Sequence, residues 1–411
     1  MGPGASISPM PENHSADVVV VGGGIIGLAI AWRAAQRGMS VTVLERAERT
    51  GKGTSHIAAG MLAPVAEVEF GEAGRRLLEL GLRSAELWPG FAAELTQAGG
   101  TEVELLRSGT LLLARDEDEA RELERQLAFR RSLGLRVERL LPSRARELEP
   151  ALAPTLRLAL EAPEDHSLDP RIVMRALRQA CLAAGVQLRE RSPVAAIELD
   201  DDERGVTGVV LEDGEHLRAE SIVLAAGPWT GEIAGLPPGH GVPVRPVKGQ
   251  ILRLRDPEGP GLVSHVLRYE GGYLLPRGDG RYVLGATMEE RGFEPLPTVG
   301  GVQELLRDAR ELIPGIDELE IEELSVGFRP GSPDNAPAIG WGATPGLLWA
   351  TGHHRNGILL APLTAELVVG LLDPSASGAT DSDEALLQAC DPGRFFTQAS
   401  STEAEPAGAS A

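Results

Sequence analysis

The stretch that decides the fold is DVVVVGGGIIGLAIAWRAAQRGMSVTVLE, residues 17–45. Four valines lead into a glycine-rich turn, an apolar helical segment follows, and a second β-branched run closes the stretch. This order predicts a strand, a turn, a helix and a second strand, which is the opening of a parallel sheet covered by helices. The apolar part, residues 18–31, is short for a membrane span and is interrupted by glycines, so we expect no membrane helix there.

A GxGxxG motif, formed by Gly22, Gly24 and Gly27, connects the first strand to the helix. These glycines permit a tight turn, the approach of a pyrophosphate to the backbone, and close packing of helix on strand. The free amides of the helix N-terminus would face the phosphates. Glu45 closes the second strand, where a carboxylate can accept hydrogen bonds from ribose hydroxyls and would repel a 2′-phosphate. The motif predicts an FAD or NAD site without separating the two. The alternative is a purely structural turn with a solvated glutamate.

Composition limits the classes of function. The 411 residues suffice for one large core or two interleaved domains, and a formal net charge of −21 disfavours nucleic-acid and membrane-surface roles. Cys181 and Cys390 form no CxxC pair, so we expect no disulfide framework. The adjacent His353 and His354 have poor geometry for joint metal ligation, so we expect no metal. Residues 1–16 do not resemble a secretory signal, and we expect a cytoplasmic protein.

Periodicity along the rest of the chain predicts a mixed architecture. Helical patterns occur at 117–132, 170–184 and 361–372, and strand patterns at 221–226, 242–328 and 346–352. Asp169 and Pro170 supply the cap and first turn of one helix. The alternating segments of 242–328 indicate antiparallel strands. The fold class is therefore α/β, α+β overall, with a discontinuous α/β domain and an inserted, mainly antiparallel β domain.

Further motifs narrow the family. They are TSHIAAGML at 54–62, AAGPW at 225–229, VGFRPGSPDNAPAIG at 326–340 and GHHRNGILLAP at 352–362. Together with the glycine turn, and in this order from about Asp17 to Leu372, they make the chain resemble the D-amino-acid oxidase superfamily. Within it, the closest likeness is to the bacterial glycine oxidases of thiamine biosynthesis. The resemblance implies non-covalently bound FAD and oxidation of glycine by oxygen, through an imine, to glyoxylate, ammonia and hydrogen peroxide.

The resemblance also implies the cofactor contacts. They are Gly22, Gly24, Ile25, Ile26, Gly27, Glu45, Arg46, Gly53, Thr54, Ala59, Gly60, Met61, Val194, His353, His354, Arg355, Asn356, Gly357, Ile358 and Leu359. Relative to the family pattern, one extra residue lies between Glu45 and Met61. No side chain is assigned as catalytic, because the flavin takes the hydride and a neutral substrate amine can assist its departure.

Four residues match the family's substrate site: Arg329, Tyr273, Met288 and Arg355. Arg329 would hold the substrate carboxylate by a planar two-point contact, with help from the Tyr273 hydroxyl. Met288 would line the side-chain pocket, and Arg355 would position substrate or flavin. Read without the family, Arg329 is a surface arginine, Tyr273 a cross-hairpin partner and Met288 a core residue. Where the glycine oxidase pattern has a histidine, this chain has Gly271, so the resemblance leaves sarcosine and small D-amino acids open as substrates.

The implied organisation follows. We expect a Rossmann-type FAD-binding domain at 17–95, 165–240 and 335–390, a substrate-binding domain at 96–164 and 241–334, and disordered tails at 1–16 and 397–411. Expected partners are a small amino acid and oxygen, the thiazole synthase of the thiamine pathway as a further candidate, and other copies of the chain, with a tetramer as one option. The rival functions are a D-amino-acid or sarcosine oxidase or dehydrogenase of broader specificity, and a non-catalytic flavin-binding subunit.

Overall fold

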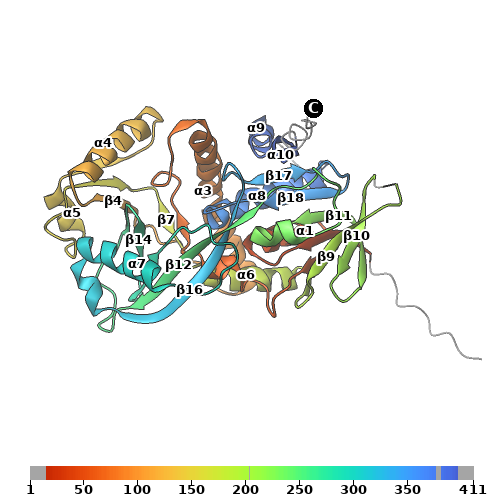
Figure 1. Cartoon of the computed structure of the whole chain (residues 1–411), viewed down its shortest axis with the longest axis horizontal. Coiled ribbons are helices and arrows are strands. Elements are labelled where there is room, and N and C mark those ends of the chain that lie inside the picture. The colour runs from red at the N-terminus through yellow and green to blue at the C-terminus, as the bar shows by residue number, and fades with distance from the viewer. Residues whose placement is uncertain (1–14, 203, 376–380, 397–411) are drawn as a thin grey trace, which may run out of the picture.

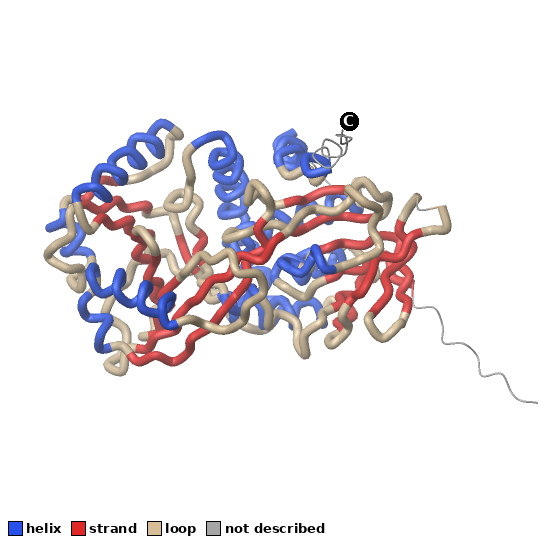
Figure 2. Tube along the Cα trace, in the orientation of Figure 1, coloured by secondary structure: helices blue, strands red, loops and turns tan. Residues whose placement is uncertain are grey.

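Two eight-stranded sheets form the framework of the computed structural model, which describes residues 15–202, 204–375 and 381–396 (Figure 1). The C-terminal tail expected at 397–411 lies outside the described residues. Residues 1–14 of the expected N-terminal tail also lie outside them. Figure 1 shows α4, α5 and α7 beside the second sheet at one end of the long axis, and β9, β10 and β11 at the other end. In Figure 2 the strands of both sheets extend toward the middle of the molecule.

The first sheet has the order β17-β18-β11-β1-β2-β8, with β10 and β9 attached beyond β11. Its strands are β1 Ser15–Val21, β2 Val41–Leu44, β8 Gln187–Arg189, β9 Val194–Leu199, β10 Val206–Leu211, β11 His216–Leu224, β17 Ala338–Trp341 and β18 Leu347–Thr351. The pairs β11–β1, β1–β2, β2–β8 and β11–β18 are parallel. The predicted parallel sheet is therefore confirmed, and the four buried valines of β1 lie at its centre.

Four helices share one apolar core with this sheet: α1 Ile25–Gln36, α3 Gly71–Gly99, α6 Pro170–Ala183 and α8 Gly357–Leu372. Asp169 caps α6 by accepting a hydrogen bond from the amide of Arg171 at 2.9 Å, as predicted. The helix α8 starts four residues earlier than the pattern indicated and contains Pro362. The 29-residue helix α3 was not predicted, because its glycines and Pro89 resemble loop sequence.

The second sheet has the order β16-β12-β15-β14-β13-β4-β6-β5. Its strands are β4 Thr110–Ala114, β5 Glu138–Leu140, β6 Leu158–Ala162, β12 Arg245–Arg255, β13 Val266–Tyr269, β14 Gly272–Pro276, β15 Arg281–Gly285 and β16 Glu320–Gly331. The pair β13–β4 is parallel and the other pairs are antiparallel. The β14–β15 pair is the hairpin predicted around residues 277–280.

The remaining elements complete the fold. They are α2 Thr54–Ile57, β3 Met61–Leu62, α4 Glu117–Ser132, α5 Pro142–Leu148, β7 His166–Ser167, η1 Gly227–Glu232, α7 Val299–Leu312, η2 Pro314–Glu318, α9 Asp381–Ala389 and α10 Gly393–Phe396. No described helix is both long and apolar enough to cross a lipid bilayer.

The strands divide between the sheets along the expected sequence segments. Apart from Ser15 and Ala16 of β1, every strand of the first sheet lies within 17–95, 165–240 or 335–390, and every strand of the second within 96–164 or 241–334. The division into two domains remains a prediction that this agreement supports. Lys248 of β12 is not the solvated lysine that its strand sequence favours, because it is fully buried and donates to the carbonyl of Leu296 at 2.8 Å.

Candidate functional site

A cavity of about 840 Å³ lies where the ends of the first-sheet strands meet the second sheet. At one end it is lined by Glu45 and Val194, and at the other by Arg329 and Tyr273. The residues that follow β1, β2 and β11 therefore face the same space as side chains of β14 and β16. Ligands bind at this edge of a parallel sheet in nucleotide-binding folds.

The glycine turn forms one wall. Gly22 has φ +112°, and a β-carbon there would lie 2.4 Å from the carbonyl oxygen of Ala225, so the turn requires glycine. A β-carbon at Gly27 would lie 1.9 Å from the carbonyl oxygen of Gly22. Gly27 therefore serves the close packing of α1 on the turn. It is the one residue of the expected cofactor set that does not line the cavity.

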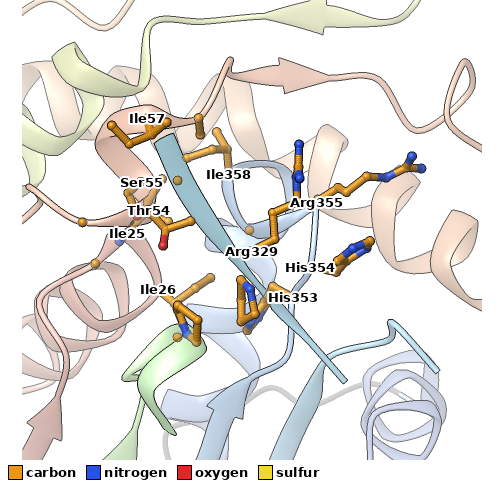
Figure 3. Close-up of a pocket in the computed structure, with 18 of the residues that line it drawn as sticks. Ile25, Ile26, Thr54, Ser55, Ile57, Arg329, His353, His354, Arg355 and Ile358 are labelled. Carbon is orange, nitrogen blue, oxygen red and sulfur yellow. Dashed lines mark hydrogen bonds between the residues drawn. The ribbon is translucent and has the colours of Figure 1, made fainter. Parts of the chain in front are cut away.

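The N-terminus of α1 faces the cavity. The amide of Ile25 donates to Oγ of Ser55 at 3.0 Å, and Figure 3 shows Ser55 and Thr54 close to Ile25. Thr54 is anchored by its hydroxyl, which donates to the carbonyl of Phe328 at 2.7 Å. Ser55 belongs to the motif TSHIAAGML but is not among the expected cofactor contacts. Its position beside a helix N-terminus suits an anionic group such as a pyrophosphate.

Glu45 is held by backbone amides. Its Oε2 accepts from Gly23 at 2.9 Å and its Oε1 from Ala47 at 2.8 Å, which fixes the carboxylate at the cavity wall. The next residue, Arg46, lies over the ring of Trp229, with 4.0 Å from Cζ to the ring centroid. Trp229 was missed as a site residue, although AAGPW is one of the quoted motifs.

The loop before α8 brings two neutral histidines to the cavity. His353 is buried, and its Nε2 lies 3.0 Å from Oγ1 of Thr364. Burial lowers the pKa of His353 to about 3. His354 has φ +46°, and burial, aided by nearby arginines, lowers its pKa to about 3 as well. Neither ring is charged at neutral pH, so the positive potential at this end comes from the N-terminus of α8 together with Arg329 and Arg355.

Arg329 of β16 is partly buried and faces the cavity (Figure 3). Its Nη1 donates to the carbonyls of Thr287 at 3.1 Å and Lys248 at 3.4 Å. Burial lowers the pKa of Arg329. No described carboxylate forms an ion pair with it, so the guanidinium keeps donors for a carboxylate ligand. The alternative of a surface arginine is wrong.

Tyr273 of β14 interacts electrostatically with Arg329. Burial raises the pKa of the Tyr273 hydroxyl. The hydroxyl therefore stays protonated and can donate a hydrogen bond. Its close neighbour is Gly285, where a β-carbon would lie 2.4 Å from Oη. Tyr273 thus occupies room that Gly285 leaves open, and Arg329 occupies room that Gly249 leaves open, because a β-carbon at 249 would lie 2.6 Å from Nη1.

The two other expected substrate residues have different surroundings. Met288 lines the cavity but is 57% exposed, so the alternative of a core methionine is wrong. Arg355 directs its guanidinium to acidic partners: Nη2 lies 3.2 Å from Oε1 of Glu69 and 3.6 Å from Oε2 of Glu67. In Figure 3 this guanidinium points away from His353. Arg355 is therefore less free than Arg329 to hold a substrate carboxylate.

Glu67 and Arg268 form a charged group at the substrate end that was not predicted from the sequence. Both line the cavity, and their side chains form an ion pair. Burial raises the pKa of Glu67, but Arg268 and Arg355 outweigh that effect and hold it below its ordinary value. The only sequence signal for a role of Glu67 in the site was its position five residues after the motif at 54–62.

Apart from Gly27, every residue expected to contact cofactor or substrate lines this one cavity. The arrangement fits FAD: a glycine turn and helix N-terminus for the pyrophosphate, a fixed carboxylate for the ribose, and a second helix N-terminus where the reduced ring carries negative charge. The free guanidinium and the neutral phenol beyond it suit a small carboxylate.

Comparison with known proteins agrees with this geometry. Residues 17–371 match the DAO family model, described as FAD dependent oxidoreductase. The chain belongs to this family. It is an FAD-dependent amino-acid oxidase, and FAD is its cofactor.

Relatives within the family share most of the chain. A glycine oxidase of Geobacillus kaustophilus (strain HTA426) is 37% identical, with 88% of this chain and 93% of the relative covered. The bifunctional protein ThiO/ThiG of Synechocystis sp. is 38% identical over 93% of this chain, which spans 54% of that relative. The crystal structure of glycine oxidase from Geobacillus kaustophilus has a TM-score of 0.82 at 35% identity, covering 89% of this chain and 97% of that one. The expected fold class is confirmed.

Proposed function

We propose that this protein is a glycine oxidase. It would convert glycine to its imine, which water hydrolyses to glyoxylate and ammonia, while oxygen is reduced to hydrogen peroxide. The observation that carries this proposal is Arg329, a partly buried guanidinium without a described acidic partner, at the end of the cavity where the flavin ring would lie. Glycine oxidases of 33% to 37% identity support the same activity.

The residues of the substrate end would bind and orient. Arg329 would grip both carboxylate oxygens of glycine through its planar fork, and the protonated hydroxyl of Tyr273 would donate a further bond. Two contacts at the carboxylate fix the direction of the Cα–H bond. FAD, when bound, accepts the hydride from Cα and passes the electrons to oxygen.

Proton handling would rest with the substrate itself. His353 and His354 have pKa values of about 3, so both are neutral, and neither has a reason to take up a proton at neutral pH. Glycine would therefore react with its amine already deprotonated, and the nearby positive charge of Arg329 in the partly enclosed cavity end favours that form over an ammonium ion.

Broader specificity is the second candidate, and Gly271 favours it. This residue lines the cavity with φ +89° and supplies no imidazole where the family pattern has a histidine, and a β-carbon there would lie 2.9 Å from Oδ2 of Asp308. Sarcosine and small D-amino acids would then be substrates as well. A non-catalytic flavin-binding subunit is less well supported, because such a protein has no need of an unpaired arginine in its cavity.

The biological setting is proposed from the relatives. ThiO/ThiG proteins join a segment similar to this chain to a second part, and this chain spans about half of their length. We infer that the glycine imine feeds the thiazole of thiamine and that the thiazole synthase is a partner. A homo-oligomer, with a tetramer as one option, and a cytoplasmic location complete the proposal.

Peroxide release from the purified yellow protein tests the activity. Glycine, sarcosine, D-alanine and D-proline would be compared by kcat/KM. Glycine should rank first, or share that place with sarcosine. A ranking led by D-alanine or D-proline would favour the broader oxidase, and absence of peroxide and of anaerobic flavin reduction with all four would overturn the proposal.

A further inference from the structure

A second cavity, of about 450 Å³, adjoins the first at its substrate end. The residues that line both are Glu67, Arg268, Tyr269, Gly271 and Arg355. They form a shared wall. Gly271 contributes only backbone to this wall, and the charged members of the wall are Glu67, Arg268 and Arg355.

Glu67 lies at the centre of this wall and is bound from two sides. One carboxylate oxygen contacts Nη1 of Arg268, and the other lies 3.6 Å from Nη2 of Arg355. Arg329 and Tyr273 also interact electrostatically with the Glu67 carboxylate. One internal carboxylate therefore occupies two arginines that stand next to the proposed carboxylate anchor.

The backbone before Glu67 is clamped on both sides. The buried Asp165 accepts hydrogen bonds from the amides of Val65 at 3.1 Å and Ala66 at 2.7 Å. The buried Arg130 donates to the carbonyls of the same two residues at 2.9 and 2.8 Å. With four backbone groups held by two buried side chains, the segment has little freedom to carry Glu67 away from the arginines.

We propose that Glu67 is a specificity-determining residue that excludes amino acids with a second carboxylate, an inference that rests on the proposed function for the site of the first one. A guanidinium pair beside Arg329 would otherwise be a receptor for such a group, since arginine forks recognise carboxylates. Glu67 takes the place of such a carboxylate, because it already pairs with both guanidinium groups. A second substrate carboxylate would meet its negative charge and find both arginines already engaged.

Ligand binding to the FAD-loaded protein provides the test. Acetate carries one carboxylate, and malonate and succinate carry two; each would be titrated while the visible absorbance of the flavin is followed. Glu67→Gln keeps the side-chain shape and removes the charge. We expect it to lower the Kd of a dicarboxylate, relative to that of acetate, by about tenfold or more, while the wild type shows no dicarboxylate preference.

Glu69→Gln is the matched control, because Glu69 is 67% exposed and contacts Arg355 but leaves Arg268 paired with Glu67. Its ratio of dicarboxylate to acetate affinity should stay within about twofold of the wild type. Glu67→Ser, which also lacks the charge, replaces Glu67→Gln if that variant does not fold. A turnover readout accompanies binding: kcat/KM for iminodiacetate should rise relative to glycine in the Glu67 variants.

An unchanged ratio in the Glu67 variants, or an equal change in Glu69→Gln, overturns the inference. The titration needs no turnover, so it separates the two proposals. A wild type that leaves glycine unoxidised while Glu67→Gln gains dicarboxylate affinity would refute the proposed activity and uphold the role of Glu67.

Discussion

Gly249 lies directly against the guanidinium of Arg329: a β-carbon at position 249 would stand 2.6 Å from Nη1 and 2.7 Å from Nη2. The two residues are diagonal neighbours on the paired strands β12 and β16, where Gly249 pairs with Gly327 and Val247 with Arg329. The glycine of PVKGQ thus sets the position of the proposed carboxylate anchor. The structural reason for this glycine is space, since its backbone lies within a regular strand.

Gly249→Ala should displace Arg329 and impair substrate binding while the fold survives. The atoms that a methyl group would meet belong to the end of a flexible side chain, which can move aside at little cost in stability. We expect kcat/KM for glycine to fall by about tenfold or more, as for loss of a charge-assisted contact, with the melting temperature nearly unchanged. Steady-state kinetics and thermal melts check this, and unchanged kinetics would show that the guanidinium position is not critical.

Glu45→Lys should weaken FAD binding. The substitution removes the ribose acceptor, breaks the bonds to the amides of Gly23 and Ala47, and places a cation at the cavity wall. The variant should purify partly colourless and bind added FAD less tightly. Glu48→Lys, at an exposed position of the same segment, is the control for the change in charge. Equal FAD affinity in both variants would remove Glu45 from the ribose site.

FAD should be held without a covalent bond to a cysteine. Cys181 and Cys390 are both buried, and neither lines the cavity. Burial raises the pKa of each thiol to about 12, so neither is a ready thiolate. Acid precipitation should release the yellow colour into the supernatant. Colour that stays in the washed, denatured pellet would contradict the expectation.

His353 should make the protein sensitive to acid. Its folded pKa of about 3 lies below the ordinary 6.5, so the unfolded chain takes up a proton first as the pH falls. The neutral ring therefore contributes stability that is complete above about pH 6.5 and is lost progressively toward pH 3. The variant His353→Gln can keep a hydrogen bond to Thr364 but has no imidazole to protonate, so its stability does not fall with pH for this reason. The difference in melting temperature between wild type and variant should shrink from pH 8 to pH 5, and a constant difference would argue against a buried neutral imidazole.

Much of the fold could be predicted because its signals are local. The valines, glycines and Glu45 specify a parallel opening unit within 29 residues, and Asp169 with Pro170 marks a helix start. The burial of Lys248 could not be predicted, because it depends on a carbonyl 48 residues away, that of Leu296. The helix α3 could not be predicted for another reason, which is that tertiary packing overrides the weak helix propensity of its glycines.

The site shows the same division. Arg329 and Tyr273 stand in recognisable motifs, whereas Glu67 has meaning only through Arg268, which is 201 residues away in sequence. The role of Asp165 is equally non-local, since it holds a turn 99 and 100 residues before it. Charge networks that join distant segments leave no periodic or spacing signal. The sequence therefore predicted Arg329 and Tyr273 at the substrate end but not Glu67 and its partners.

Arg329→Lys should keep the flavin and sharply weaken glycine oxidation. Lysine preserves the charge but loses the planar fork, so it can neither hold both carboxylate oxygens nor keep both carbonyl contacts of the present side chain. Removing one partner of a buried charged pair costs about 2–5 kcal/mol, so even partial loss should lower kcat/KM by about tenfold or more. Arg329→Met should be worse, because it also removes the charge. Arg355→Lys is the matched comparison, and its effect should be smaller because Glu67 and Glu69 already engage that side chain. Flavin reduction by glycine without oxygen, followed by stopped flow, isolates binding and hydride transfer from the oxygen step. If Arg329→Lys reduced at the wild-type rate at every glycine concentration while Arg355→Lys did not, the carboxylate anchor would be Arg355.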